Sequence, residues 1–197
     1  MPGYSVFEIK RALESMIFLV DTREQDTPAL RRRLQALGRP WERTKLDVGD
    51  YSCTYETPDG ARRQLPACVE RKMGLDELVS CFTTGRGRFE REFQRAVGVG
   101  TRMHLLVENG SWDRVLAGEY RSRITSASLS ASMLAWSRRY DFPIYFCRPE
   151  NTGQMIYKIL RYELKELLER GGGVGTGMDQ ARPADSKPLD LAGKGAV

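Results

Sequence analysis

The sequence is poor in histidine and has no closely spaced cysteines. Its 197 residues include one histidine and four cysteines, and no two cysteines form a CxxC pair. Zinc sites and disulfide-stapled secreted folds are built from such clusters, so the sequence argues against both classes. We therefore expect reduced thiols and an intracellular location.

Long apolar runs are also missing. The early run MIFLV, residues 16–20, is far shorter than the roughly 20 apolar residues that a membrane-spanning helix requires. The residues before it are typical of an amphipathic helix and not of a signal peptide. These absences predict a soluble protein with no membrane association.

The residues that are present suffice for one folded domain. The hydrophobic fraction is 41%, which predicts a single core over residues 1–170. From residue 171 the chain reads GGGVGTG and then becomes polar, and such a segment buries too little surface to offset the entropy of ordering. We expect residues 171–197 to form a disordered tail. The tail carries as many acids as bases, so the formal charge of +5 belongs to residues 1–170 and favours a polyanionic partner such as DNA.

Hydrophobic spacing predicts an α/β fold. Short apolar runs predict strands at residues 16–21, 41–46, 51–56, 67–71, 103–108 and 143–147, with helices between most of them. The order indicates a central mixed sheet that is covered by helices on both faces.

Three of the predicted helices carry specific expectations. Thr27 and Pro28 begin a helix in which Arg31 to Arg33 are expected to form a solvated face. A helix after the loop TTGRG is expected to turn its apolar residues inward, and the last helix, about residues 151–170, has a broad apolar stripe that is expected to face the core. The residues of these two apolar faces are Phe89, Phe93 and Val97, and Ile156, Ile159, Leu160, Leu164, Leu167 and Leu168.

The stretch ACVERKMGLDEL, residues 67–78, places charges at the end of a predicted core strand. Because side chains alternate across a strand, Glu70 and Lys72 are expected on one face and Arg71 on the other. Asp50 stands at the start of the preceding major strand, and its carboxylate can reach Glu70 if the two strands pair. Two carboxylates and an ammonium group would then lie close together at the end of the predicted strand.

Other acids follow strand signals as well. Asp21 and Glu24 flank Arg23 after an earlier strand, and Asp76 opens the helix after ERK. Two carboxylates 4 Å apart repel by about 4 kcal/mol at an effective dielectric constant near 20. Either these groups are held apart, or a divalent cation lies among them, and oxygen ligands favour Mg²⁺ or Mn²⁺.

A metal ion, two carboxylates and a lysine form a set that can hydrolyse phosphodiesters. The metal polarises the phosphate and lowers the pKa of a bound water, while the lysine orients or deprotonates that water and offsets negative charge. By spacing alone the pattern is weak, because an ERK triplet is more often solvated surface charge.

The order of the motifs resembles the nuclease domain of the XPF-type structure-specific endonucleases (the ERCC4 nuclease domain), a family that includes XPF, Mus-type resolvase subunits and archaeal Hef. The resemblance extends from about Met16 to about Leu168. The segments that carry it are VDTRE (20–24), VGDY (48–51), VERKMGLDEL (69–78), GRFEREFQRA (87–96) and LLVEN (105–109).

The resemblance implies a restriction-endonuclease-like core that cuts one DNA strand near a branch or flap, in repair or recombination, and leaves a 5′-phosphate. It implies that Asp50 and Glu70 are metal ligands, helped by the backbone carbonyl of Arg71, and that Lys72 activates water. The remaining charged positions that it places around the site are Asp21, which would hold the ion through a water or bind a second ion, and Arg23, Glu24, Arg71 and Asp76.

The resemblance also leaves questions open. Family members usually carry a helix-hairpin-helix module after the nuclease domain, whereas this sequence continues into its glycine-rich segment, so a preference for branched DNA is not assured. The loop TTGRGR offers Arg86 and Arg88 to DNA phosphates, or is an ordinary glycine loop. Family members pair through their nuclease domains, so a homodimer or heterodimer is expected, with the stripe on the last helix as a candidate surface.

Three functions therefore compete. The leading hypothesis is a metal-dependent endonuclease acting on branched DNA. The second is a DNA-binding or scaffolding subunit of a nuclease heterodimer whose site is idle, and the third is a restriction-type enzyme that cuts duplex DNA. The intact acidic set favours catalysis.

Overall fold

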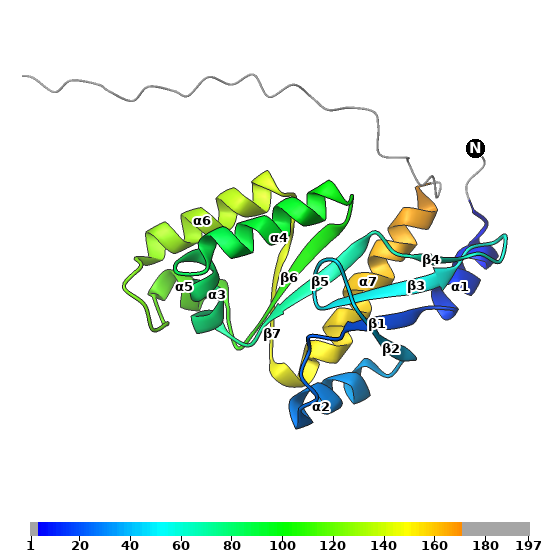
Figure 1. Cartoon of the computed structure of the whole chain (residues 1–197), viewed down its shortest axis with the longest axis horizontal. Helices are drawn as coiled ribbons and strands as arrows, with labels where there is room; N and C mark the ends of the chain where they lie inside the picture. The colour runs from blue at the N-terminus through cyan, green and yellow to red at the C-terminus, as the bar shows by residue number, and fades with distance from the viewer. Residues whose placement is uncertain (1–3, 171–197) are drawn as a thin grey trace, which may run out of the picture.

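Short apolar segments form a central sheet in the computed structural model, which describes residues 4–170 (Figure 1). The strand order is β2-β1-β3-β5-β6-β7, and β4 pairs with β3. The strands are β1 (Ile17–Asp21), β2 (Trp41–Thr44), β3 (Tyr51–Glu56), β4 (Arg62–Gln64), β5 (Ala67–Lys72), β6 (Arg102–Glu108) and β7 (Ile144–Cys147). The segment β4 was not predicted, because its three residues are charged or polar and all exposed.

The sheet is mixed, as predicted. Strand β3 runs antiparallel to β1, β4 and β5, whereas β1–β2, β5–β6 and β6–β7 are parallel pairs. Parallel neighbours require crossover connections, and helices supply them in each of these pairs. The carboxyl ends of β5, β6 and β7 therefore meet at one edge of the sheet.

Helices cover both faces, and each face has its own apolar cluster. The helices α1, α2 and α7 pack on one face, and α3 to α6 pack on the other (Figure 1). Their bounds are α1 (Val6–Glu14), α2 (Pro28–Leu37), α3 (Leu75–Phe82), α4 (Arg86–Gly98), α5 (Trp112–Ala117), α6 (Ser126–Arg139) and α7 (Thr152–Glu169), with a 3₁₀ turn at Pro149–Asn151. The charges at the end of β5 thus lie between two hydrophobic layers.

Local sequence explains how α2 reaches its place. The Thr27 hydroxyl accepts a hydrogen bond from the backbone N–H of Leu30 at 3.2 Å, and Pro28 occupies the first turn. Gly38 ends the helix with φ 63°, a left-handed conformation that glycine adopts without strain. Where α7 packs against α2, a Cβ on Gly153 would lie 2.2 Å from the carbonyl oxygen of Arg33. Only glycine therefore lets α7 approach α2 this closely.

One packing prediction was wrong, whereas the expected burial of the apolar stripe on α7 was confirmed. Val97 is 59% exposed, and Ala96 takes the inward position after Phe89 and Phe93. The stripe on α7 is not a free dimer surface, because five of its residues lie in the cluster with α1 and α2 and Leu167 packs against that cluster. Those five are Ile156, Ile159, Leu160, Leu164 and Leu168.

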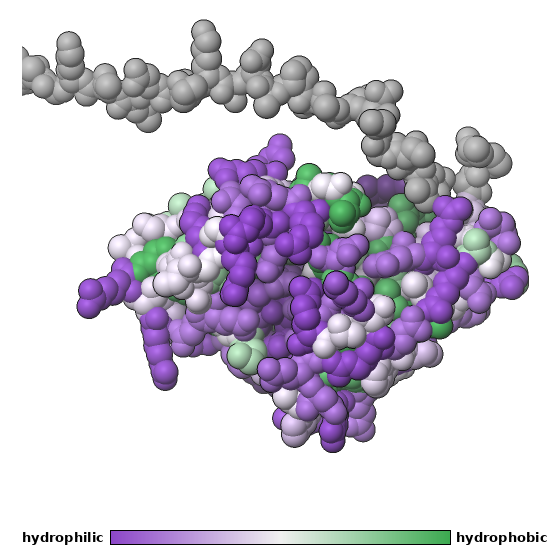
Figure 2. Space-filling model, in the orientation of Figure 1, coloured by the Kyte–Doolittle hydropathy of each residue, from purple (hydrophilic) through white to green (hydrophobic). Residues whose placement is uncertain are grey.

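The outer surface is mainly hydrophilic on the face drawn in Figure 2, with isolated hydrophobic residues. None of the helices formed by residues 4–170 is both long enough and apolar enough to cross a bilayer. The predicted tail, residues 171–197, lies outside the described residues.

Candidate active site

The pairing of β3 with β5 brings Asp50 to the ERK segment. Tyr51 and Val69 are direct partners in the antiparallel ladder, and the backbone N–H of Asp50 donates to the carbonyl of Val69 at 2.9 Å. The backbone N–H of Arg71 in turn donates to Oδ2 of Asp50 at 2.8 Å. Gly49, with φ 73°, permits this approach, because a Cβ there would lie 2.8 Å from the side chain of Cys68.

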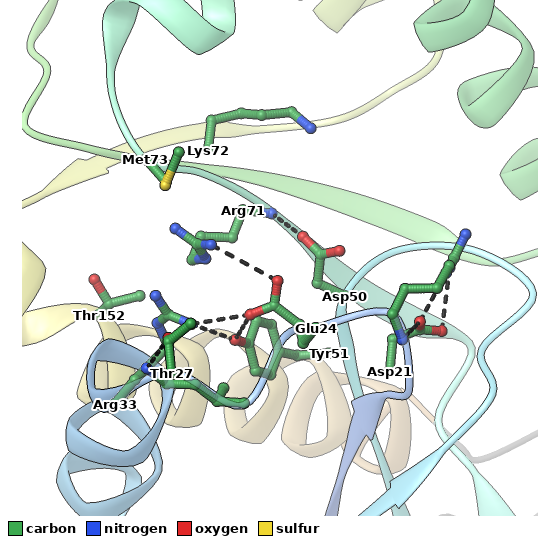
Figure 3. A network of polar contacts seen from close by, with 12 residues as sticks. Asp21, Glu24, Thr27, Arg33, Asp50, Tyr51, Arg71, Lys72, Met73 and Thr152 are labelled. Atoms are coloured by element: carbon green, nitrogen blue, oxygen red, sulfur yellow. Dashed lines mark hydrogen bonds and ion pairs between the residues drawn. The ribbon is translucent and has the colours of Figure 1, made fainter.

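Glu70 and Lys72 share one face of β5, as the two-residue period predicts. Nζ of Lys72 lies 2.5 Å from Oε1 of Glu70, and both residues are buried, with exposed fractions of 8% and 7%. The ammonium also lies 5.1 Å from the ring centre of Phe89 on α4. Figure 3 shows the side chains of Lys72 and Arg71 on opposite sides of the strand.

Burial makes the carboxylates of this site costly to ionise. Burial and the charge of Glu70 together raise the pKa of Asp50 to about 7, although the N–H of Arg71 opposes the rise. Burial likewise raises the pKa of Glu70 above its ordinary value, although Lys72 counteracts it. For Lys72, burial favours the neutral form, but the carboxylate of Glu70 outweighs it and raises the pKa of the ammonium. Lys72 is therefore a cation in this arrangement.

Asp21 has other partners. Its side chain is fully buried, and both carboxylate oxygens accept hydrogen bonds. Oδ1 accepts from the backbone N and Nε of Arg23, each at 2.7 Å, and Oδ2 accepts from Nη2 of Arg23 at 3.1 Å and the backbone N of Leu46 at 2.7 Å. Burial works against ionisation, but these donors outweigh it and lower the pKa of Asp21. Asp21 thus holds the turn after β1 against the chain near Leu46.

Asp76 lies apart as well. Its Oδ1 accepts from the backbone N–H of Arg121 at 2.6 Å, which ties α3 to the connection between α5 and α6. The acid of α3 that approaches Lys72 is Glu77, the residue after Asp76, with 3.9 Å between Nζ and Oε1. Within residues 4–170, no three acidic, histidine or cysteine side chains converge as a set that could hold a metal ion. The expected trio Asp21, Asp50 and Glu70 is therefore not assembled.

A network of buried charges occupies the opposite face of β5 (Figure 3). Nη1 of Arg33 lies 3.0 Å from Glu24 Oε2 and 2.7 Å from the hydroxyl of Tyr51, which itself donates to Glu24 at 2.6 Å. Arg71 lies 3.7 Å from Glu24 and 3.4 Å from Glu108. Arg71 and Glu24 thus meet as part of a charge-balanced network.

Glu108 closes the network from the end of β6. Its Oε1 accepts from Thr152 Oγ1 at 2.7 Å and lies 3.4 Å from Nη2 of Arg33. The Nε atoms of Arg33 and Arg71 are buried without a hydrogen-bond partner among residues 4–170. The network therefore connects α2, α7 and three strands, and two of its N–H donors have no partner among these residues.

Sequence reasoning missed the roles of Arg33, Tyr51 and Glu108. Arg33 was predicted to be solvated with Arg31 and Arg32, but it is only 7% exposed. Its position was detectable, because residue 33 stands three after Leu30 and four before Leu37, on the buried stripe of the helix. No comparable local signal marked Tyr51 or Glu108.

The two arginines expected in a glycine loop lie in a helix instead. The structure begins α4 at Arg86. The guanidinium of Arg86 donates to Ser132 Oγ at 3.3 Å and its carbon lies 4.7 Å from the ring centre of Trp136, so this exposed side chain is held against α6. Arg88 is exposed in the first turn.

Asp50 and Glu70 fit the requirements of a divalent cation. Both are oxygen donors, Glu70 is buried and Asp50 is half-buried, and the charge of Glu70 raises the pKa of Asp50, so a cation near both would favour their ionised forms. A cation there would oppose the two largest causes that raise the pKa of Asp50, which are burial and the charge of Glu70.

Comparison with known proteins identifies the family and the fold. The ERCC4 domain family model matches residues 20–159. A solved structure of XPF from Aeropyrum pernix is 25% identical, with a TM-score of 0.55 over 77% of this chain and 66% of that one. A second structure, of that XPF in complex with DNA, is 25% identical, with a TM-score of 0.55 over 76% of this chain and 66% of that one.

This chain therefore spans about 66% of the length of those two structures. No curated protein sequence matches it. Because the family match covers more than half of the sequence and the mixed sheet with helices on both faces agrees with it, the chain belongs to the ERCC4 domain family and has the restriction-endonuclease-like fold of an XPF-type nuclease domain.

Proposed function

We propose that this protein is a metal-dependent DNA endonuclease that hydrolyses phosphodiester bonds in branched or flap DNA, during repair or recombination, and leaves a 5′-phosphate. The observation that carries the proposal is the convergence of Asp50, Glu70 and Lys72 at the end of β5. Family membership and the likeness to a structure titled as a complex with DNA support it.

Each residue has a defined task in this proposal. Asp50 and Glu70 would hold Mg²⁺ or Mn²⁺, which when bound supplies Lewis acidity and a lower pKa for a bound water. The ammonium of Lys72, already aligned by Glu70 at 2.5 Å, donates a hydrogen bond to the attacking solvent molecule or to a phosphate oxygen and offsets its negative charge. Arg71 acts by its backbone, since its side chain belongs to the network on the other face.

Three of the predicted site residues have positioning roles in this proposal. Asp21 and Arg23 hold the turn that precedes the site, and Glu24 holds Arg71. DNA contacts are assigned to Arg88, and Arg86 is retained as a residue that orients α4. Pairing of two subunits through this domain remains a prediction.

The test is cleavage of an end-labelled fork and flap with Mg²⁺ or Mn²⁺, with linear duplex as a comparison substrate. We expect metal-dependent nicks near the branch and none above background with Lys72→Ala. A wild-type protein that cuts no better than that variant contradicts the proposal. Equal cutting of branched and linear DNA, at a short recognition sequence, supports the restriction-type alternative.

One observation favours a second candidate, a DNA-binding or scaffolding subunit with an idle site. The ammonium of Lys72 is paired with Glu70, and residues 4–170 hold no ready three-ligand metal cluster. This candidate predicts DNA affinity that falls steeply with salt and no turnover with either metal. The same fork binding and cleavage assays distinguish the two.

A further inference from the structure

Two hollows flank the end of β5 and share two residues. One has a volume of about 510 Å³ and reaches from Arg23 to Arg33 and Arg71. The other, about 310 Å³, lies over the start of α3 and reaches Arg114 and Glu119. Met73 and Asn109 line both hollows and therefore form the ridge between them.

Both residues of the ridge are exposed to solvent. Met73 directly follows Lys72, and 62% of this large apolar residue is exposed to solvent. Asn109 follows β6 with φ 51°, one of two non-glycine residues with positive φ among residues 4–170, and its side chain is exposed. Asparagine is one of the few non-glycine residues that adopt this left-handed conformation readily, which suits it to the turn after β6.

The backbone of the ridge is firmly held. The N–H of Met73 donates to Glu77 Oε2 at 2.7 Å, and Glu77 also approaches Lys72. The N–H of Asn109 donates to the carbonyl of Cys147 at 3.0 Å, and its carbonyl accepts from Arg114. The two side chains thus project from fixed points at the carboxyl ends of neighbouring parallel strands, the usual place for ligands in such sheets.

Charge distinguishes the two hollows. The larger one is lined by three guanidinium groups and two carboxylates, those of Arg23, Arg33, Arg71, Glu24 and Glu108. The smaller one is lined by three carboxylates, those of Asp76, Glu77 and Glu119, and by the guanidinium of Arg114. In the larger hollow the guanidinium groups of Arg33 and Arg71 balance the two carboxylates, and 60% of the Arg23 side chain is exposed to a ligand. The smaller hollow has a net negative charge, which repels a phosphate-bearing nucleotide.

We infer that the larger hollow binds one unpaired nucleotide of the DNA strand next to the scissile phosphate, with its base stacked on Met73 and its edge or sugar hydrogen-bonded by the Asn109 amide. The inference rests on the proposed function and refines its substrate class to DNA with an unpaired base at the cutting point. The volume of the larger hollow suits a single nucleotide. The polarisable thioether of Met73 suits the face of a base, and the amide of Asn109 suits its polar edge. The ridge would then select branch points within the nuclease domain itself.

A binding experiment tests this without catalysis. Full-length Lys72→Ala protein is titrated, by fluorescence anisotropy, with forks that carry a single abasic site at successive positions around the branch. We expect one position at which loss of the base weakens binding by about 5- to 100-fold, the range for a stacked base. Adding Met73→Ala should weaken binding of the intact fork similarly and leave binding of that abasic fork unchanged.

The matched control is Val97→Ala, which removes an apolar side chain of similar exposure, 59%, from the end of α4 that leads into the start of β6. It should not alter the abasic pattern. If no abasic position depends on Met73, or if the control changes the pattern equally, the inference is overturned.

A kinetic experiment tests Asn109. In otherwise wild-type protein, Asn109→Gly keeps the left-handed backbone but removes the amide. We expect KM for fork DNA to rise about 3- to 10-fold with kcat retained, and an unchanged KM contradicts the amide's role. If wild-type protein cuts no DNA, the proposed activity fails while the anisotropy titration still decides whether the hollow binds a base.

Discussion

The two faces of β5 both carry acids and cations, but they arrange them differently. On the face toward α3 and α4, Glu70 and Lys72 form a pair beside Asp50, and burial raises the pKa of both acids. On the face toward α2 and α7, the side chain of Arg71 lies among Glu24, Glu108 and Arg33 in a balanced network. Adjacent residues of one short motif thus perform different tasks. The first face is poised to accept a cation and a phosphate, whereas the second fixes the strand that presents them.

The largest expected effect comes from disrupting the charge network on the face of β5 toward α2 and α7. Replacing Arg33 with leucine leaves Glu24 and Glu108 buried with fewer partners, so the free energy of unfolding should fall by about 3–5 kcal/mol. Urea unfolding followed by circular dichroism measures it. Arg31→Leu, on the exposed side of the same helix, removes only a surface pair with Asp26 and should change stability by less than about 1 kcal/mol. Equal losses in both variants would contradict the assigned difference.

The next largest effect comes from removing Lys72 from the face of β5 toward α3 and α4, which we call the reactive face. Lys72→Ala should lower the rate of fork cleavage by about 100-fold or more, because it removes the cation nearest the reacting phosphate. The folded state should persist, as judged by an unchanged circular dichroism spectrum and cooperative melting. Arg23→Ala, which changes an exposed arginine of the neighbouring turn, serves as a comparison and should reduce the rate less. A comparable loss in both variants would deny Lys72 its special role.

The acids of the reactive face should destabilise the protein when they ionise without a cation. The folded-state pKa of Asp50 is about 7, above its ordinary value of 3.8, so stability is lost as pH rises between these two values. Asp50→Asn should therefore be more stable than wild type by about 1–3 kcal/mol at pH 8 in EDTA, and equally stable near pH 4. Melting temperatures across this pH range measure the effect. A variant that is less stable than wild type at pH 8 would count against the burial of an uncompensated carboxylate.

The smallest expected effect concerns DNA contacts beyond the two faces. Arg88→Ala should lower the slope of log affinity against log salt by about 1, as expected for one lost phosphate contact. Arg86→Ala should leave that slope unchanged, because Arg86 is held by Ser132 and Trp136. Anisotropy titrations at several salt concentrations give both slopes. A change with Arg86 but not with Arg88 would reverse the assignment.

Local patterns predicted part of the site correctly. The two-residue period of a strand was enough to place Glu70 and Lys72 together and Arg71 opposite them. Asp50 was expected to reach Glu70 if the two strands pair; the strands do pair, and the Asp50 carboxylate accepts a hydrogen bond from the backbone N–H of Arg71. The positions of Asp21 and Asp76 were not predictable in this way, because their partners are backbone N–H groups of Leu46 and Arg121, 25 and 45 residues away.

The amino-acid sequence by itself determined the strand and helix pattern, the alternation within ERK and the family. The first two of these features depend on residues close together in the sequence, because the backbone of a strand or helix sets the direction of each side chain. Only the tertiary structure decided which groups Arg33 meets, that Glu108 reaches Arg33 and Arg71, and that Asp21 is bound by donors of the chain itself. Such contacts depend on how α2, β1, β5 and β6 are packed, and a hydrogen bond forms only when the fold brings two distant groups within about 3 Å of each other.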